Sequence, residues 1–180
     1  MQRFLDQTRR EYSLNQRLVV SGLAGVLFVF LIPWLLVRLG PRLDRRLRLP
    51  RFCCGAANAL GGLLVVPGVA LGFWSGYTQI AHARGTPIPL VATKNLLVDG
   101  PFRLCRNPMT LGTLVLYTGI GVAVGSFSAL AAVFAFGAVL VAYLKLFEER
   151  ELEARFGQEY RDYRASTPFI LPRFFGRQGT

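Results

Sequence analysis

Two short polar stretches hold the residues whose types and spacing could do chemistry. The first is GPFRLCRNPM, residues 100–109, which places two arginines, a cysteine and an Asn-Pro pair directly before a long apolar run. The second is EERELEARFGQEYRDY, residues 148–163, which directly follows another apolar run. A membrane-spanning helix does not itself need such a polar stretch beside it. We therefore take these two stretches as the candidate functional residues.

The first stretch predicts an anion site at the start of a helix. Asn is favoured at the N-cap and Pro in the first turn, so Asn107-Pro108 predicts a sharp helix start. A helix start presents free N–H groups and a positive dipole, and Arg106 adds a full charge beside it. Residues 99–101, Asp-Gly-Pro, predict a turn that folds the preceding loop back over this start. The plain alternative is that Asn107 is a helix cap and nothing more.

The second stretch predicts a cation site. Four apolar or aromatic residues share one helical face: Leu152, Phe156, Tyr160 and Tyr163. On a helical wheel Glu149 falls within this stripe and Glu148 lies at its edge. Carboxylates shielded by aromatic side chains need a cationic partner. Ion pairs with Arg150 or Arg155 are the plain alternative to a bound cation.

The remaining polar residues exclude several other chemistries. His82 is the one histidine, so we expect no multi-histidine metal site. Cys53 and Cys54 are adjacent and Cys105 stands alone, so no CxxC pair exists. No phosphate-binding loop or dinucleotide fingerprint occurs. We expect no metal, no redox disulfide and no P-loop nucleotide site.

Composition predicts the elements that must position these residues. The chain has 180 residues, of which 52% are hydrophobic and only 17% charged, and its mean hydropathy is +0.39. This is typical of a small integral membrane protein with one domain, residues 1–180. The net charge of +11 comes from arginines that flank apolar segments. Without a nucleic-acid-binding signature it predicts no nucleic-acid partner.

Apolar runs near the 20-residue length of a spanning helix occur four times. They are residues 18–37, 52–80, 109–125 and 127–147. Gly125-Ser126 separates the last two, which predicts a tight helical hairpin. We expect an all-α membrane bundle of about four transmembrane helices, the first a retained anchor, followed by a cytoplasmic C-terminal helix.

The basic residues predict how the bundle is oriented. Four spans place the N-terminus, residues 81–108 and the C-terminal tail on one side, which holds 15 of the 21 lysines and arginines. The positive-inside rule predicts that this side is cytoplasmic. The six arginines between Arg38 and Arg51 lie on the other side, against that rule, and could bind lipid phosphates. We expect a multi-pass protein whose active site faces the cytoplasm.

The motifs in residues 85–172 resemble the isoprenylcysteine carboxyl methyltransferase and phospholipid methyltransferase superfamily of membrane enzymes. The resemblance rests on GPFRLCRNPMTLG, an apolar hairpin, an E-E pair and FGQEYRDY, in that order. Residues 1–84 are similar only as generic membrane helices. The resemblance implies methyl transfer from S-adenosylmethionine to a lipophilic acceptor, which is a lipid amine, a carboxylate or a thiol. The implied partners are the lipid bilayer and that acceptor, and the oligomeric state stays open.

The resemblance also implies the residues that bind the cofactor. By residue-to-residue match they are Lys94, Asn95, Leu96, Leu97, Phe102, Arg106, Asn107, Pro108, Met109, Thr110, Glu148 and Glu149. The family spacing favours Glu148 as the main carboxylate, whereas the helical wheel favours Glu149. Arg106 and Lys145 are candidates for positioning the reactants, and the sequence identifies no catalytic base.

Three positions depart from the family pattern. Thr110 replaces a tyrosine, Leu144 replaces the arginine of the carboxyl-methylating members, and Phe169 replaces an arginine of the tail. These departures argue against a prenylcysteine substrate. They also leave two alternatives open: a non-catalytic membrane binding or structural protein of the same fold, and an NADPH-dependent membrane reductase.

Overall fold

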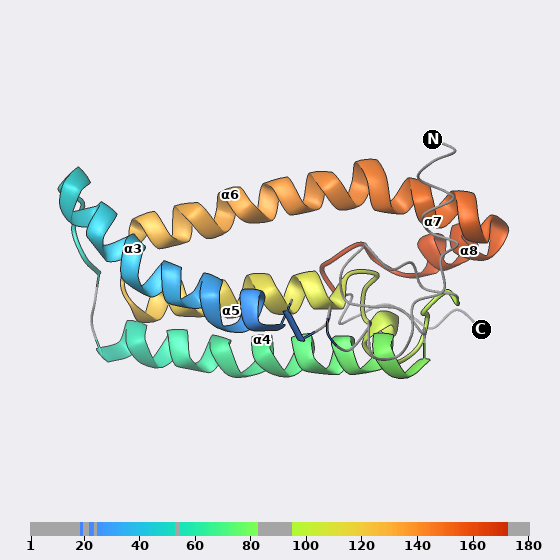
Figure 1. Ribbon diagram of the computed structural model, residues 1–180, viewed down its shortest axis with the longest axis horizontal. Coiled ribbons are helices and arrows are strands. Elements are labelled where there is room, and N and C mark those ends of the chain that lie inside the picture. The colour runs from blue at the N-terminus through green and yellow to red at the C-terminus, as the bar shows by residue number, and fades with distance from the viewer. Residues whose placement is uncertain (1–18, 20–21, 24, 53–54, 83–94, 173–180) are drawn as a thin grey trace.

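The computed structural model describes residues 19, 22–23, 25–52, 55–82 and 95–172. Every regular element in these residues is helical, which confirms the predicted all-α fold. Four helices run up and down beside one another (Figure 1). They are α3 (Ile32–Leu47), which continues from the π-helix η1 (Val26–Leu31), α4 (Gly55–His82), α5 (Pro108–Ala123) and α6 (Phe127–Tyr143).

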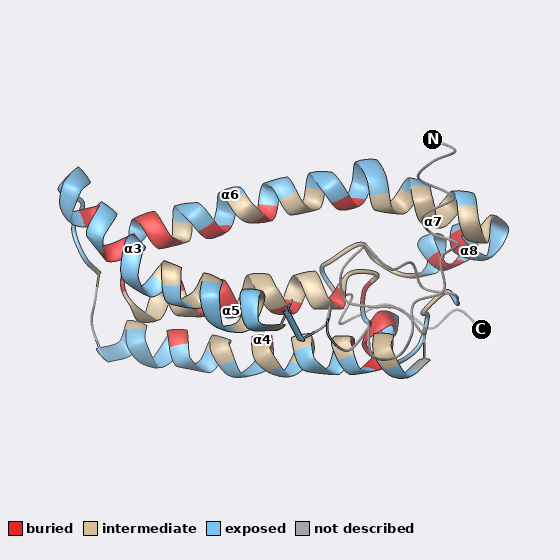
Figure 2. Ribbon diagram, in the orientation of Figure 1, coloured by how far each residue is buried: buried red, intermediate tan, exposed pale blue. Residues whose placement is uncertain are grey.

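The outward faces of this bundle are apolar. Figure 2 shows that the outer sides of α4 and α6 are exposed along most of their length. Leu63 and Val66 on α4 are 71% and 68% exposed, and Phe134 on α6 is 81% exposed. A soluble protein rarely exposes so continuous an apolar surface. The exposed faces are those of a helical membrane bundle.

Three of the four predicted spans have the length and composition to cross a membrane. The apolar helical segments are Val26–Leu47, Gly55–Ala81 and Phe127–Phe156. The remaining predicted span, residues 109–125, corresponds to α5, which is apolar but has only 16 residues. At about 1.5 Å per residue it is about 24 Å long, shorter than the ~30 Å hydrocarbon core. Pro108 fixes its start, and the left-handed Gly125 (φ 61°) makes the predicted hairpin turn after its end.

The predicted boundary after the first span is wrong, because α3 continues as a helix through most of the arginine-rich segment to Leu47. Tertiary contacts explain the extension. Gly40, Pro41 and Asp44 are buried, and the Asp44 Oδ1 atom accepts a hydrogen bond of 2.8 Å from the backbone N–H of Ser128. Asp44 therefore satisfies a free N–H group at the start of α6 from another helix. The pattern of charges gave no sign of this contact.

Helices α4 and α5 pack backbone to backbone through glycines. A Cβ atom on Gly68 would lie 2.5 Å from the Leu116 nitrogen, and one on Gly61 would lie 2.5 Å from the Ala123 nitrogen. Small residues allow such close approach in membranes. A Cβ on Gly72 would meet nothing within 4 Å. The contact glycines of α4, Gly61 and Gly68, are seven residues apart, which is about two turns, and Gly112 and Gly119 of α5 have the same spacing.

The C-terminal segment is two helices rather than the single predicted one. The chain leaves α6 through the π-helix η3 (Leu144–Glu148) and continues as α7 (Glu149–Phe156). Gly157 then takes a positive φ of 55°, and α8 (Gln158–Ser166) follows it. The stripe of residues 152–163 is therefore bent at Gly157, because a left-handed glycine cannot continue an α-helix.

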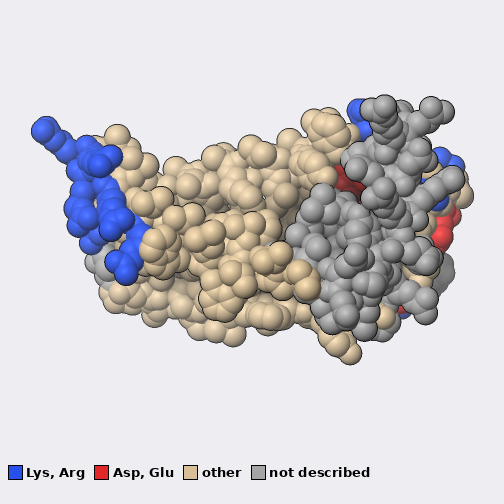
Figure 3. All heavy atoms as spheres, in the orientation of Figure 1, with Lys and Arg blue, Asp and Glu red and all other residues tan. Residues whose placement is uncertain are grey.

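The two ends of the bundle differ in charge. The arginines at the end of α3 gather at one end (Figure 3), next to the turn between α5 and α6. The other end holds both signs of charge and carries the short 3-10 helix η2 (Gly100–Arg103), α7 and α8. Both polar stretches singled out in the sequence therefore lie at the same end, opposite the arginine cluster.

Candidate active site

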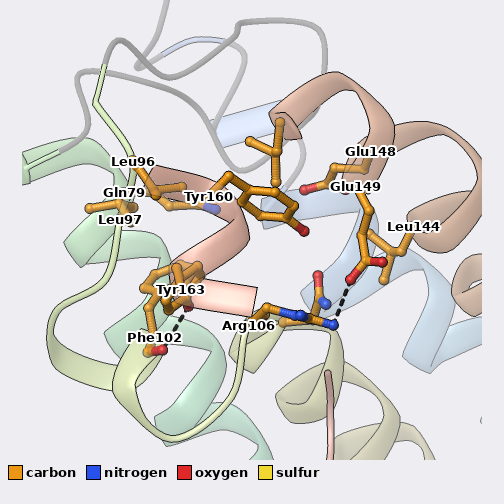
Figure 4. Close-up of a pocket in the computed structure, with 12 residues that line it drawn as sticks. Gln79, Leu96, Leu97, Phe102, Arg106, Leu144, Glu148, Glu149, Tyr160 and Tyr163 are labelled. Atoms are coloured by element: carbon orange, nitrogen blue, oxygen red, sulfur yellow. Dashed lines mark hydrogen bonds and ion pairs between the residues drawn. The ribbon is translucent and has the colours of Figure 1, made fainter. Parts of the chain in front are cut away.

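A cavity of about 70 Å³ lies at the end of the bundle where the two polar stretches meet (Figure 4). Helix α4, the segment before α5, the α6–η3–α7 run and α8 each contribute to its wall. The lining residues are Gln79, Leu96, Leu97, Phe102, Arg106, Asn107, Leu144, Glu148, Glu149, Leu152, Tyr160 and Tyr163.

Most of the residues predicted to bind the cofactor line this one cavity. They are Leu96, Leu97, Phe102, Arg106, Asn107, Glu148 and Glu149. Others do not reach it: Asn95 is exposed, and Pro108, Met109 and Thr110 form the first turn of α5 outside the lining set. Lys94 lies outside the described residues. Of the two positioning candidates, Arg106 lines the cavity, whereas Lys145 is exposed outside it.

An ion pair joins the two polar stretches inside the cavity. The Arg106 Nη2 atom lies 2.7 Å from the Glu149 Oε1 atom, and the two side chains are only 10% and 17% exposed. Arg106 also donates from Nη1 to the carbonyl oxygen of Arg164, at 3.0 Å. The partner of Glu149 is thus Arg106, more than 40 residues away in the sequence, while Arg155 lies 3.5 Å from Glu151. The predicted anion site and cation site therefore neutralise each other.

Glu148 adds a second carboxylate to the same cavity. It forms no ion pair with the described part of the chain. The π-helical turn of η3 explains its placement, because hydrogen bonds between residues five apart put positions i, i+4 and i+5 on one side. Leu144, Glu148 and Glu149 have this spacing, and all three line the cavity. With Arg106 paired to Glu149, Glu148 is the carboxyl group of the lining that has no cationic partner among the described residues.

Two tyrosines of α8 form the aromatic wall. Tyr163 donates its hydroxyl hydrogen bond to the carbonyl oxygen of Phe102, at 2.7 Å. The Tyr160 hydroxyl is directed toward the side of the cavity where Glu149 and Arg106 lie (Figure 4). Burial, followed by the charge of Glu149, raises the pKa of Tyr160 to about 12. Burial raises the pKa of Tyr163 as well, so both phenols stay protonated at neutral pH and act as hydrogen-bond donors.

Asn107 occupies the predicted N-cap position but does not cap α5 with its side chain. Its Nδ2 atom donates to the carbonyl oxygen of Phe169, at 3.1 Å. The backbone N–H of Arg106 donates to the carbonyl oxygen of Pro168, at 2.9 Å. The Phe169 ring faces both Arg106 and Lys145, with its centroid 5.6 and 5.0 Å from their charged groups. The interpretation of Asn107 as a side-chain cap is wrong, because the side chain is turned toward the tail and its Oδ1 atom accepts no bond from the first turn of α5. The bond from Nδ2 holds the tail beside the cavity.

Sequence reasoning missed several residues of the cavity as binding residues. Leu152, Tyr160 and Tyr163 were predicted as a shielding face, and Leu144 was noted only as a departure from the family pattern. Gln79 was missed entirely, and its buried Oε1 atom has no hydrogen-bond partner. A polar side chain near the end of the long apolar helix α4 is the signal that could have found it.

The charged side chains of the cavity are complementary to the charges of S-adenosylmethionine, but the cavity is too small to hold the whole molecule. Glu148 and Glu149 suit an ammonium and a sulfonium, and Arg106 suits a carboxylate. The volume of about 70 Å³ is well below the ~300 Å³ lower bound of ordinary ligand pockets. Binding of the whole cofactor therefore requires these side chains to separate.

A comparison with known families identifies the chain. The model of a family described as phospholipid methyltransferase matches residues 56–159, more than half of the sequence. The chain belongs to this family. The match covers α4 to α7, and so contains every lining residue of the cavity except the two tyrosines of α8.

Among curated proteins, this chain is similar to methanethiol S-methyltransferase 2 of Bradyrhizobium diazoefficiens. The two are 34% identical over 98 residues, which is 54% of this chain and 35% of the relative. The chain therefore aligns with about a third of that protein's length. No solved structure matches the chain.

Proposed function

We propose that this membrane methyltransferase uses S-adenosylmethionine and transfers its methyl group to a lipophilic acceptor at the cavity around Arg106. The observation that carries the proposal is the largely buried Arg106–Glu149 ion pair, at 2.7 Å, with Glu148 beside it, which has no ion-pair partner among the described residues. An arginine and a glutamate in contact are complementary to the ammonium and carboxylate of an amino acid. The additional carboxylate matches the extra positive charge of a sulfonium.

The residues of the cavity have separable roles in this proposal. Glu149 and Glu148 accept hydrogen bonds from the ammonium, and Arg106 donates to the carboxylate. Tyr160 remains protonated and donates a further hydrogen bond. The cofactor supplies an activated methyl group. The buried walls exclude water, which favours attack by an anionic acceptor, and positioning supplies most of the remaining rate enhancement.

The lining favours a thiol over a carboxylate as the acceptor. Leu144 is 5% exposed and apolar where carboxyl-methylating relatives carry an arginine. Arg106 is the one cationic side chain in the lining set, and it is engaged by Glu149. The Bradyrhizobium relative is named as a methanethiol S-methyltransferase, which supports the same choice. In the proposed step the acceptor sulfur loses its proton to solvent and bonds to the methyl carbon, while S-adenosylhomocysteine leaves.

Calorimetry and a transfer assay test this function. We expect the detergent-purified protein to bind S-adenosylmethionine and S-adenosylhomocysteine but not NADPH. With a labelled methyl donor, lipophilic thiols should accept label, whereas amine and carboxylate analogues should not. Binding without transfer to any acceptor would favour the non-catalytic alternative. NADPH binding alone would favour the reductase.

The proposal includes a multi-pass topology with the active site facing the cytoplasm. The arginine-rich end of α3 and the cavity lie at opposite ends of the bundle (Figure 1). The support for the cytoplasmic side is the count of basic residues, 15 of 21 of which belong to the side of the cavity. We expect an impermeant thiol reagent to label Arg46→Cys in intact cells and Arg103→Cys only after lysis. The background lacks Cys53, Cys54 and Cys105. Labelling of Arg103→Cys but not Arg46→Cys in intact cells would invert the topology.

A further inference from the structure

A second hollow lies at the opposite end of the bundle, between α3 and the start of α6. It is an open groove of about 730 Å³. Its walls are apolar and come mainly from Leu35, Leu36 and Leu39 of α3 and from Ala129 and Ala132 of α6. Most of the groove belongs to α3, which precedes the family-matched residues 56–159. The groove is thus separate from the methyltransferase cavity and mostly outside the region shared with the family.

One end of the groove carries two arginines. Arg42 and Arg46 line it and are exposed. They are four residues apart on α3, so their side chains lie on the same helical face. Neither forms an ion pair with the described part of the chain.

The surroundings do not neutralise these charges. Six arginines lie between Arg38 and Arg51, with Asp44 as the one acidic residue among them. Asp44 is fully buried and accepts the Ser128 N–H bond, so it is directed into the α3–α6 contact. The mouth of the groove is therefore strongly positive (Figure 3).

The dimensions of the groove match one lipid chain. Its apolar wall runs from Ile32 to Leu43 along α3, a rise of about 16 Å at about 1.5 Å per residue. One leaflet of the hydrocarbon core is about half of 30 Å thick. An acyl chain laid against this wall would end at the arginine pair, where a phosphate would meet both guanidinium groups.

We propose that this groove binds one anionic phospholipid, with its phosphate at Arg42 and Arg46 and one acyl chain between α3 and α6. The lipid is not the methyl acceptor. Ser128 and Glu148 are 20 residues apart along one nearly continuous helical run, which is about 30 Å. The phosphate therefore lies at the other membrane face from the cavity, and the inference does not depend on the proposed function.

Native mass spectrometry of the full chain in detergent tests this site, with phosphatidylglycerol and phosphatidylcholine as probes. We expect one phosphatidylglycerol to bind at least about tenfold more tightly than phosphatidylcholine. Arg42→Gln/Arg46→Gln should lose about tenfold or more of that affinity. The control Arg45→Gln/Arg48→Gln removes the same charge from residues outside the groove lining and should change it less than about threefold.

The apolar wall has its own test. Ala132→Trp should block the bound chain, whereas Ala131→Trp, on an exposed neighbour outside the lining, should not. Equal affinity for the two lipids would overturn the site. An equal loss of phosphatidylglycerol affinity in the two arginine double variants would also overturn it, because it would indicate a diffuse basic surface. A dimer that Ala132→Trp dissociates would show that a second copy of the chain covers the groove instead.

Discussion

Glu148→Gln/Glu149→Gln is expected to weaken S-adenosylmethionine binding by at least about tenfold, or about 1.4 kcal/mol. The two carboxylates line the cavity, and the change removes both negative charges that meet the ammonium and the sulfonium. Hydrogen bonds between ionised groups are about twice as strong as neutral ones, so an amide oxygen cannot replace them. Calorimetry of the purified protein measures the change directly.

The single variants separate binding from folding. Glu149→Gln leaves Arg106, whose side chain is only 10% exposed, without its carboxylate partner, and breaking a buried pair in this way is destabilising. Glu148→Gln removes a charge that has no ion-pair partner among the described residues. We therefore expect Glu148→Gln to lose cofactor affinity while keeping the thermal midpoint of the wild type.

Glu151→Gln is the matched control, because Glu151 pairs with Arg155 and does not line the cavity. It removes the same charge from the same helix and should leave cofactor binding unchanged. If Glu151→Gln weakens binding as much as Glu148→Gln does, the effect is one of net charge, and the assignment of the cavity as the cofactor site is wrong.

The features that could be predicted from the sequence are those decided by neighbouring residues. Pro108 begins α5 because its fixed φ and its missing N–H group suit the first turn of a helix. Gly125 makes the hairpin turn because its φ of 61° suits a residue without a side chain. Gly157 carried the same kind of signal, but the stripe of residues 152–163 was weighted above it. The helix break there could have been predicted.

Contacts between distant residues could not be predicted in this way. Asp44 stabilises α6 across more than 80 residues of sequence, and nothing local distinguishes it from a solvated charge in an arginine-rich segment. Asn107 has a suitable local role as a cap, but its side chain is turned toward the tail and donates to the carbonyl oxygen of Phe169. The same limit applies to the site. Both charged stretches were identified as partners for a ligand, but their pairing emerged only from the three-dimensional structure, which brings Arg106, before α5, to within 2.7 Å of Glu149 at the start of α7.

Helix α4 contributes Gln79 to the cavity, and it approaches α5 closely at Gly61 and Gly68. Gly61→Ala/Gly68→Ala is expected to lower the free energy of unfolding by about 2 to 4 kcal/mol. Each new Cβ would lie 2.5 Å from a backbone nitrogen of α5. Overpacking lowers the free energy of unfolding by about 1–3 kcal/mol per site, and the hydrogen-bonded helix backbone of α5 cannot move away locally. The better helix propensity of alanine recovers up to about 1 kcal/mol at each position.

Gly62→Ala/Gly72→Ala provides a control of identical composition on the same helix. A Cβ at either position would meet nothing within 4 Å, so only the helix-propensity term remains and the thermal midpoint should stay level or rise. The contact pair should also weaken cofactor binding, because forcing α4 away from α5 moves Gln79 relative to Arg106 in the cavity. The measurements are thermal unfolding in detergent and calorimetry on both double variants. Equal stability of the two would mean that α4 and α5 do not meet at these glycines, and the cavity at their end would then lack the support that this packing gives it.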